Sequence, residues 1–188
     1  MNIALITASG IGSRMNNSTP KQFLLVHNKP LIIYTIEAFQ SNKDIDKIVV
    51  VTNLEYIDQL KEWCKQYNLS KVTLITKGGA SRQESVYNGL LALEQIGVTN
   101  LDIVLIHDAA RPLVSQKTIS DNIMAAKKYD AVNTVIPAVD SIFRSISGTY
   151  IEKLENRDEF YLSQTPQTFK YELILKAHKN ALTNIWSN

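Results

Sequence analysis

The sequence predicts an α/β fold in which helices cover both faces of a doubly wound, mostly parallel sheet, giving three layers. Two observations predict this class. Short β-branched runs alternate with longer segments of helical periodicity, and the runs are apolar throughout, as in parallel strands that are buried on both faces. A length of 188 residues with 45% apolar residues fits a single domain, 1–188, with one sizeable core.

Apolar, β-branched runs predict five strands of this sheet: NIALIT (2–7), KIVVVT (47–52), VTLIT (72–76), DIVLIH (102–107) and AVNTVIPA (131–138). Helical spacing predicts the segments that follow or separate them: 30–40, 55–67, 81–96, 116–128 and about 170–182. Pro30 suits a helix start, and Ser81 and Glu84 have capping-box spacing. The stretch 139–165 breaks this alternation with short pieces around Gly148, which predicts a small antiparallel arm.

Composition excludes several functional classes. The net charge of +2 comes from mixed signs without a basic block, so nucleic-acid binding has little support. Cys64 is the only cysteine, which excludes an internal disulfide and suits a reducing compartment. No apolar run approaches the roughly 18 residues that span a bilayer, and the first residues indicate a buried strand better than a signal peptide. We therefore expect a cytoplasmic protein without a membrane partner.

A glycine loop follows the first strand in TASGIGSRMNNSTPKQF (7–23). A dinucleotide fingerprint needs a third glycine where Met15 stands, and an acid after the second strand that is also missing. A phosphate loop of the Walker type fails because Lys21 lies nine residues beyond Gly12. Two interpretations stay open: a loop that wraps phosphates with its N–H groups, with Arg14 and Lys21 adding charge, or a turn with two solvated cations.

Five stretches in order resemble the sugar-alcohol-phosphate cytidylyltransferases, which have the fold of nucleotide-diphospho-sugar transferases: ASGIGSRM…PKQF, GGASRQESV (78–86), HDAARP (107–112), AVDSI (138–142) and NRDEFYLSQTPQTF (156–169). The resemblance implies that the phosphate of a polyol phosphate attacks the α-phosphorus of CTP, releasing pyrophosphate and forming a CDP-alcohol. The favoured alcohol is 2-C-methyl-D-erythritol 4-phosphate, and the alternative is D-ribitol 5-phosphate of cell-surface polymer synthesis.

The resemblance also implies roles for particular residues. Arg14 and Lys21 would hold the triphosphate and stabilise the transition state. Asp108 would bind Mg²⁺ or another divalent cation. The nucleotide would be bound by Ala8, Gly10, Gly12, Gly79, Ala80 and Ser85. The polyol phosphate would be bound by Arg111, Ser141, Arg157 and Thr165. Ser141 and Arg157 would act across the interface of a homodimer formed through the arm. His27, His107 and His178 lack metal-ligand spacing, so no zinc site is expected.

Two departures from the family pattern leave other functions open. Ser9 stands where the family usually has Ala or Gly. The family also continues into a C-terminal segment with a further phosphate-binding lysine, which we expect to be missing from this chain by truncation. The alternatives are a non-catalytic nucleotide-binding module, and a nucleotidyltransferase that acts on a sugar 1-phosphate with another base.

Overall fold

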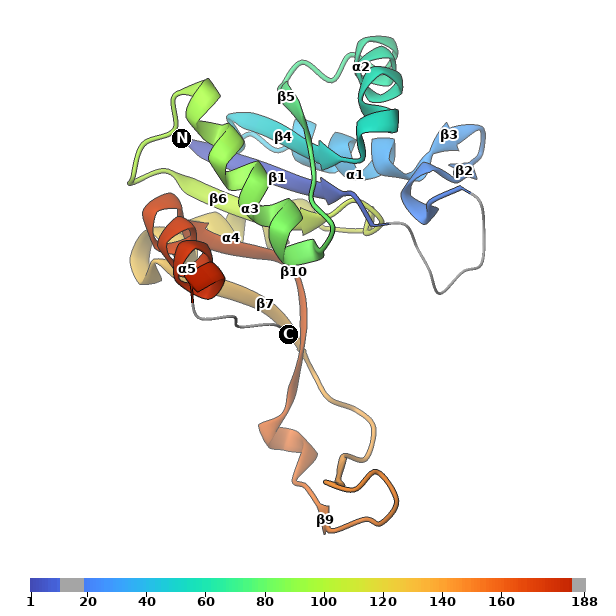
Figure 1. Ribbon diagram of the computed structural model, residues 1–188, viewed down its shortest axis with the longest axis vertical. Helices are drawn as coiled ribbons and strands as arrows, with labels where there is room; N and C mark the ends of the chain where they lie inside the picture. The colour runs from blue at the N-terminus through green and yellow to red at the C-terminus, as the bar shows by residue number, and fades with distance from the viewer. Residues whose placement is uncertain (11–18, 184–188) are drawn as a thin grey trace.

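A six-stranded sheet runs through the centre of the molecule in the computed structural model, which describes residues 1–10 and 19–183 (Figure 1). Its strands are β1 (Asn2–Ala8), β4 (Lys47–Thr52), β5 (Val72–Lys77), β6 (Ile103–Asp108), β7 (Ala131–Pro137) and β10 (Tyr161–Lys170). Their spatial order is β5-β4-β1-β6-β10-β7. The first four are parallel neighbours, and β10 is antiparallel to both β6 and β7. The predicted fold class is confirmed.

Strand β1 lies inside the sheet, where Ile3 is in register with Lys47 of β4 and Val104 of β6. Residues Ile3 to Ile6 are fully buried because helices cover both sides of this strand. That explains why the run is apolar at every position rather than at alternate ones. The strand delivers the glycine loop to its carboxyl end.

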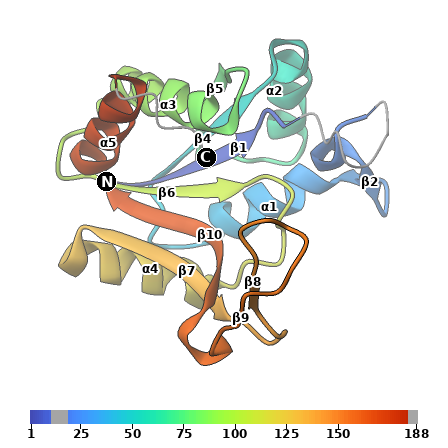
Figure 2. The ribbon, with the colours of Figure 1, turned by 60° about the horizontal axis from the view of Figure 1, so that its bottom comes forward.

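In the described part of the chain, five α-helices form the two outer layers. They are α1 (Leu31–Gln40), α2 (Ile57–Gln66), α3 (Arg82–Ala92), α4 (Gln116–Tyr129) and α5 (Tyr171–Thr183). One core cluster joins α1, α2 and α4 to one face of the sheet, and the other joins α3 and α5 to the opposite face. Figure 2 shows α3 and α5 on one side of the strands and α1 and α4 on the other.

Helix α3 begins at a cap that the sequence predicts. The Ser81 hydroxyl accepts from the N–H of Glu84 at 3.0 Å. The Glu84 carboxylate accepts from the N–H of Ala80 at 2.8 Å, one residue before the N–H that a capping box usually engages. The loop before α3 is therefore bonded to the helix from both directions.

Short elements complete the chain. A turn through His27 and Asn28, both with positive φ, joins β2 (Leu25–Val26) to β3 (Lys29–Pro30) in a hairpin that the sequence analysis did not predict. The 3-10 segments are η2 (Lys21–Phe23), η3 (Leu54–Tyr56), η4 (Leu93–Ile96) and η5 (Arg157–Glu159).

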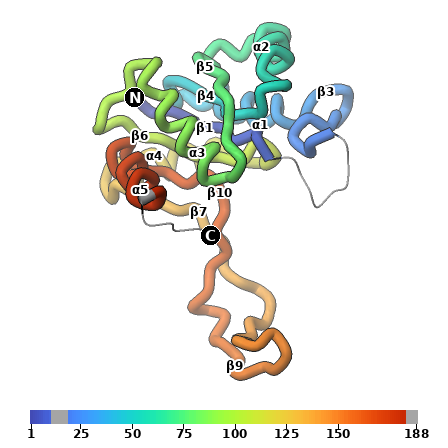
Figure 3. Tube along the Cα trace, in the orientation of Figure 1, coloured from blue at the N-terminus to red at the C-terminus, as the bar shows by residue number. Residues whose placement is uncertain are grey.

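The arm leaves the sheet after β7 and returns along β10, and it carries the strand pair β8 (Phe143–Arg144) and β9 (Lys153–Leu154) (Figure 3). The first residues of β10 pair with the end of β7, and the last ones pair with both β6 and β7. Strand β10 therefore belongs to the arm at its start and to the central sheet at its end.

Candidate active site

The carboxyl ends of β1, β5 and β6 bring together three of the sequence-predicted segments. Ala8 ends β1, Gly78 follows β5, and Asp108 ends β6. The chain is tied across these ends by backbone bonds: Gly78 N–H donates to Thr52 O at 2.8 Å, and Ala109 N–H donates to Thr7 O at 3.0 Å. This edge is where ligands bind in doubly wound sheets.

The glycine loop is described up to Gly10, while Gly12 and Arg14 lie outside the described residues. Ala8 is buried. Among the described residues, a side chain at Gly10 would meet nothing within 4 Å. Across the loop, the amide of buried Gln22 donates to the carbonyl oxygens of Ala8 at 2.6 Å and Gly10 at 2.9 Å. The next residue towards the N-terminus, Lys21, is exposed.

The segment after β5 is packed around the hydroxyl of Ser85. This oxygen accepts from the Gly79 N–H at 3.0 Å and donates to Ser81 O at 2.8 Å. The hydroxyl of Ser9 lies 2.6 Å from it, which joins the glycine loop to α3. At Gly79 a Cβ would lie 2.2 Å from Glu84 Cγ, so only glycine fits there. Gly79 and Ala80 line a cavity of about 500 Å³.

Asp108 carries the negative charge at this edge, and two arginines flank it. Arg111 Nε is 3.0 Å from one carboxylate oxygen, and Arg82 is 3.4 Å from the other. Arg111 also donates to Gln164 Oε1 at 2.6 Å, and Arg82 reaches Gln167 Oε1 at 3.4 Å. The Asp108 N–H faces Thr165 Oγ1 at 3.5 Å. Strand β10 thus adds its polar side chains to the site.

His107 supports the turn that follows Asp108. Burial lowers the pKa of its imidazole, with a smaller lowering contribution from the charge of Arg111, so the ring is neutral at pH 7. Its Nε2–H donates to the carbonyl oxygen of Arg111 at 2.9 Å. The ring packs on Phe39, with centroids 4.9 Å apart. The bond closes the turn that carries Asp108 and Arg111.

Two predicted substrate residues lie apart from these groups. Ser141 and Arg157 are on the arm, which projects away from the body (Figure 1). Arg157 Nη1 donates to the carbonyl oxygen of Val139 within the arm at 2.9 Å. Within the described ranges, neither side chain is bonded to Asp108, Arg111 or Lys21. The fold of one chain therefore brings together Ala8, Gly10, Gly79, Ala80, Ser85, Asp108, Arg111 and Thr165, but not the arm pair.

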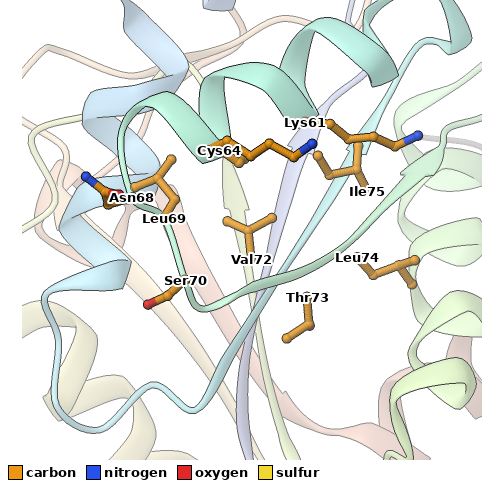
Figure 4. A pocket seen from close by; sticks show the side chains of 10 residues that line it. Lys61, Cys64, Asn68, Leu69, Ser70, Val72, Thr73, Leu74 and Ile75 are labelled. Atoms are coloured by element: carbon orange, nitrogen blue, oxygen red, sulfur yellow. The ribbon is translucent and has the colours of Figure 1, made fainter.

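Gln22, Arg82 and Gln164 also lie at this site, and none of them was predicted from the sequence. All three lie inside quoted stretches (PKQF, GGASRQESV and NRDEFYLSQTPQTF), so the signal that could have found them is their closeness in sequence to the assigned residues. A larger cavity of about 660 Å³ lies between α2 and β5, and Figure 4 shows Cys64 and Lys61 of α2 on its wall, across from Val72 and Ile75 of β5. None of the predicted site residues lines this cavity.

In the searched part of the chain, no cluster of three or more His, Cys, Asp or Glu side chains could hold a metal, and no helix could span a membrane.

The fold and the strand-end site define a nucleotidyltransferase of the α/β class. The family model described as IspD, 2-C-methyl-D-erythritol 4-phosphate cytidylyltransferase, matches residues 2–187. The chain belongs to this family, which confirms the resemblance found in the sequence.

Curated relatives carry two different substrate names. A ribitol-5-phosphate cytidylyltransferase of Vibrio parahaemolyticus is 42% identical over 182 residues, which is 96% of this chain and 76% of that protein. A 2-C-methyl-D-erythritol 4-phosphate cytidylyltransferase of Clostridium acetobutylicum is also 42% identical over 182 residues, covering 96% of this chain and 77% of that protein. Sequence identity alone therefore does not separate the two alcohols.

A solved structure has the same fold. The 4-diphosphocytidyl-2C-methyl-D-erythritol synthase of Anaerococcus prevotii superposes with a TM-score of 0.83 at 26% identity, covering 100% of this chain and 77% of that one.

Proposed function

We propose that this cytidylyltransferase joins CTP to 2-C-methyl-D-erythritol 4-phosphate with loss of pyrophosphate. The observation that carries the proposal is the group of charges at the carboxyl end of β6, where Asp108 lies between Arg82 and Arg111 and beside Thr165. D-Ribitol 5-phosphate is the second candidate acceptor, because the Vibrio parahaemolyticus relative that carries this name is 42% identical.

The reaction requires charge and positioning more than a base. A phosphate monoester loses its second proton near pH 6, so the attacking oxygen is already anionic at neutral pH. It bonds to the α-phosphorus of CTP while the bond to the β-phosphate oxygen breaks and pyrophosphate leaves. Negative charge gathers on the oxygens around phosphorus, so preorganised cations lower the barrier. In the proposal, Lys21 and Arg14 supply these charges, and Arg111 and Thr165 hold the acceptor.

Ala8, Gly10 and Gly12 are proposed to wrap the nucleotide, while Gly79, Ala80 and Ser85 contact cytosine. The close packing at Gly79 keeps this segment free of a side chain. Asp108 is proposed to bind Mg²⁺. One carboxylate fits that ion, because Mg²⁺ is commonly held by one or two carboxylates together with substrate phosphates. The bound ion would neutralise the triphosphate.

The arm supports a homodimer in this proposal. Its exposed apolar side chains include Val139, Phe143, Ile146, Tyr150, Ile151 and Leu154. An apolar surface of this kind marks a protein interface, and a second copy of the chain is the proposed partner. Ser141 and Arg157 would then reach the acceptor site of the other subunit. The cytoplasmic location stays a prediction from the sequence.

The test crosses CTP, UTP, ATP and GTP with both polyol phosphates and with a sugar 1-phosphate, in the presence of Mg²⁺, and measures pyrophosphate. We expect release with CTP and 2-C-methyl-D-erythritol 4-phosphate. Release only with ribitol 5-phosphate would replace the acceptor. CTP binding without turnover would favour a non-catalytic module, and turnover of a sugar 1-phosphate with another nucleotide would overturn the reaction class. The Lys21→Ala variant should lose about 100-fold or more in kcat, as when one preorganised contact is removed.

A further inference from the structure

Gln22 is a buried polar residue between two parts of the site. Its side chain is 3% exposed. Its amide nitrogen donates to the carbonyl oxygens of Ala8 and Gly10, at 2.6 and 2.9 Å. Both N–H groups of the amide are therefore used on the chain that leaves β1. The two bonds connect segments that are 12 and 14 residues apart in the sequence.

The turn that carries Gln22 also carries Lys21. In η2 the Phe23 N–H donates to Pro20 O at 2.9 Å. Phe23 is buried and stacks on Tyr56, with ring centroids 4.1 Å apart. A 3-10 turn has three residues, so successive side chains point about 120° apart. With Gln22 and Phe23 directed into the body, Lys21 is left on the exposed side of the turn.

We propose that Gln22 is a positioning residue that fixes Lys21 and the described start of the glycine loop, residues 8–10, in one geometry. It acts through Lys21 and the loop and touches neither substrate. The inference rests on the proposed function, in which Lys21 stabilises the transition state. A displacement of about 1 Å of a positioned group can cost about 100-fold in rate, so the tether controls turnover more than nucleotide affinity.

The chemistry of the contact requires an amide at this position. Methionine has nearly the same length but donates no hydrogen bond, so both carbonyl oxygens lose their bond to the amide, and the Ala8 oxygen keeps the Thr52 hydroxyl at 3.5 Å. Glutamate would place a carboxylate against the same two oxygens. Gln40 offers a matched control, because it also bridges two segments: its amide donates to Ser70 Oγ and accepts from the Lys71 N–H, both at 2.9 Å.

The experiment compares Gln22→Met, Gln22→Glu and Gln40→Met with the unmodified full chain. For Gln22→Met we expect kcat to fall by about 10- to 100-fold, with KM for CTP changed less than threefold and a cooperative thermal transition retained. Gln40→Met should keep kcat within about twofold of the unmodified chain, since its contacts lie away from the site. In a Lys21→Ala background, Gln22→Met should lower kcat by a much smaller factor than in the unmodified chain, because the part of its effect that acts through Lys21 is gone.

If the losses in kcat caused by Lys21→Ala and Gln22→Met are independent in the double variant, the positioning role is overturned. A change confined to KM in Gln22→Met would overturn it as well. If Gln22→Met does not fold, the shorter amide in Gln22→Asn takes its place in the same cycle. Amide hydrogen exchange gives a readout without turnover: peptides covering 8–10 and 21–23 should exchange faster in Gln22→Met and not in Gln40→Met. Unchanged exchange would overturn the tether itself. An unmodified chain that turns over none of the substrates would instead overturn the proposed function.

Discussion

Asp108 is the residue where the charges of the site meet. Arg82 is half-exposed and 3.4 Å from the carboxylate, so this ion pair adds little to stability. In Arg82→Gln we therefore expect a melting temperature within about 2 °C of the unmodified chain. The same variant should lose about tenfold in kcat/KM, because a cation beside the proposed triphosphate site is removed.

Arg82→Lys should recover part of that loss, since it keeps the charge but not the planar fork. The exposed pair Lys61–Asp58 provides a control, and Lys61→Gln should leave turnover unchanged. Steady-state kinetics and thermal unfolding of the three variants test whether Arg82 contributes to turnover rather than to stability. Full activity in Arg82→Gln would remove the residue from the site.

Cys64 gives a second prediction from a single side chain. Burial raises the pKa of its thiol from 9.0 to about 11. A raised pKa reduces the thiolate, so at pH 8 about 100-fold less of the reactive form is present than for an ordinary thiol. A thiolate of higher pKa is more nucleophilic, which recovers about tenfold of that loss.

We therefore expect iodoacetamide to modify the folded chain at least about tenfold more slowly than the chain in urea, and the rate to rise up to about pH 11. Mass spectrometry of the alkylated peptide measures the rate of modification at each pH. Equal rates in the folded and unfolded chain would contradict the burial of this thiol.

The motifs that resemble the family pointed to Lys21, Asp108 and the loop at Gly79, whose roles stay predictions. These motifs were not enough for Arg82. An arginine directly after a helix cap is usually a solvated cation, and its partners Asp108 and Gln167 lie 26 and 85 residues away. Gln22 is similar, because its importance comes from two carbonyl oxygens that only the folded chain brings to it. Long-range contacts of this kind leave no trace in local spacing.

Strand β10 shows where prediction of elements reaches its limit. Its sequence, YLSQTPQTFK, contains Pro166, and a proline normally argues against a strand inside a sheet. The pairing with β7 shifts register between Ser163 and Gln167, so the strand tolerates the proline at an irregularity. The hairpin at 25–30 was missed because its turn uses His27 and Asn28 rather than glycine. The long apolar strands and capped helices carried clear local signals and were predicted.

Helix α3 lies so close to the sheet that Gly89 has no room for a side chain. A Cβ there would be 2.6 Å from Val51 Cγ2 and 2.8 Å from Leu5 Cδ1, and both residues are fully buried. In an open helix, replacing glycine by alanine stabilises by about 1 kcal/mol. Here we expect Gly89→Ala to lower the free energy of unfolding by about 1–3 kcal/mol, because the core is overpacked.

Urea unfolding measures the effect of Gly89→Ala. The double variant Gly89→Ala with Val51→Ala removes the nearest clashing methyl, so its loss should be smaller than the sum of the two single losses. Additive losses would mean that the helix shifts instead and that the close approach does not limit this position.

The contacts within one folded chain do not explain why the arm has exposed apolar side chains. Ile146 and Tyr150 are 78% and 76% exposed, and Arg157 bonds only to the arm itself among the described contacts. The broken alternation at 139–165 was enough to predict an excursion from the sheet. It could not show what the excursion packs against, because that surface belongs to another molecule in the proposed dimer.

A mixed dimer tests whether the arm completes the site of its partner. We expect Lys21→Ala to inactivate the body of a subunit and Arg157→Ala to inactivate its arm. If each site combines one body with the other subunit's arm, a heterodimer of the two variants contains one site with both defects and one intact site. Differently tagged variants, co-expressed and purified through both tags, should therefore show about half of the unmodified dimer's kcat. Each homodimer should be nearly inactive.

If Arg157 served its own subunit, both sites of the heterodimer would carry a defect, and no activity would return. Light scattering on the same samples establishes that the dimer has formed, so inactivity of a verified heterodimer would assign the arm to its own chain.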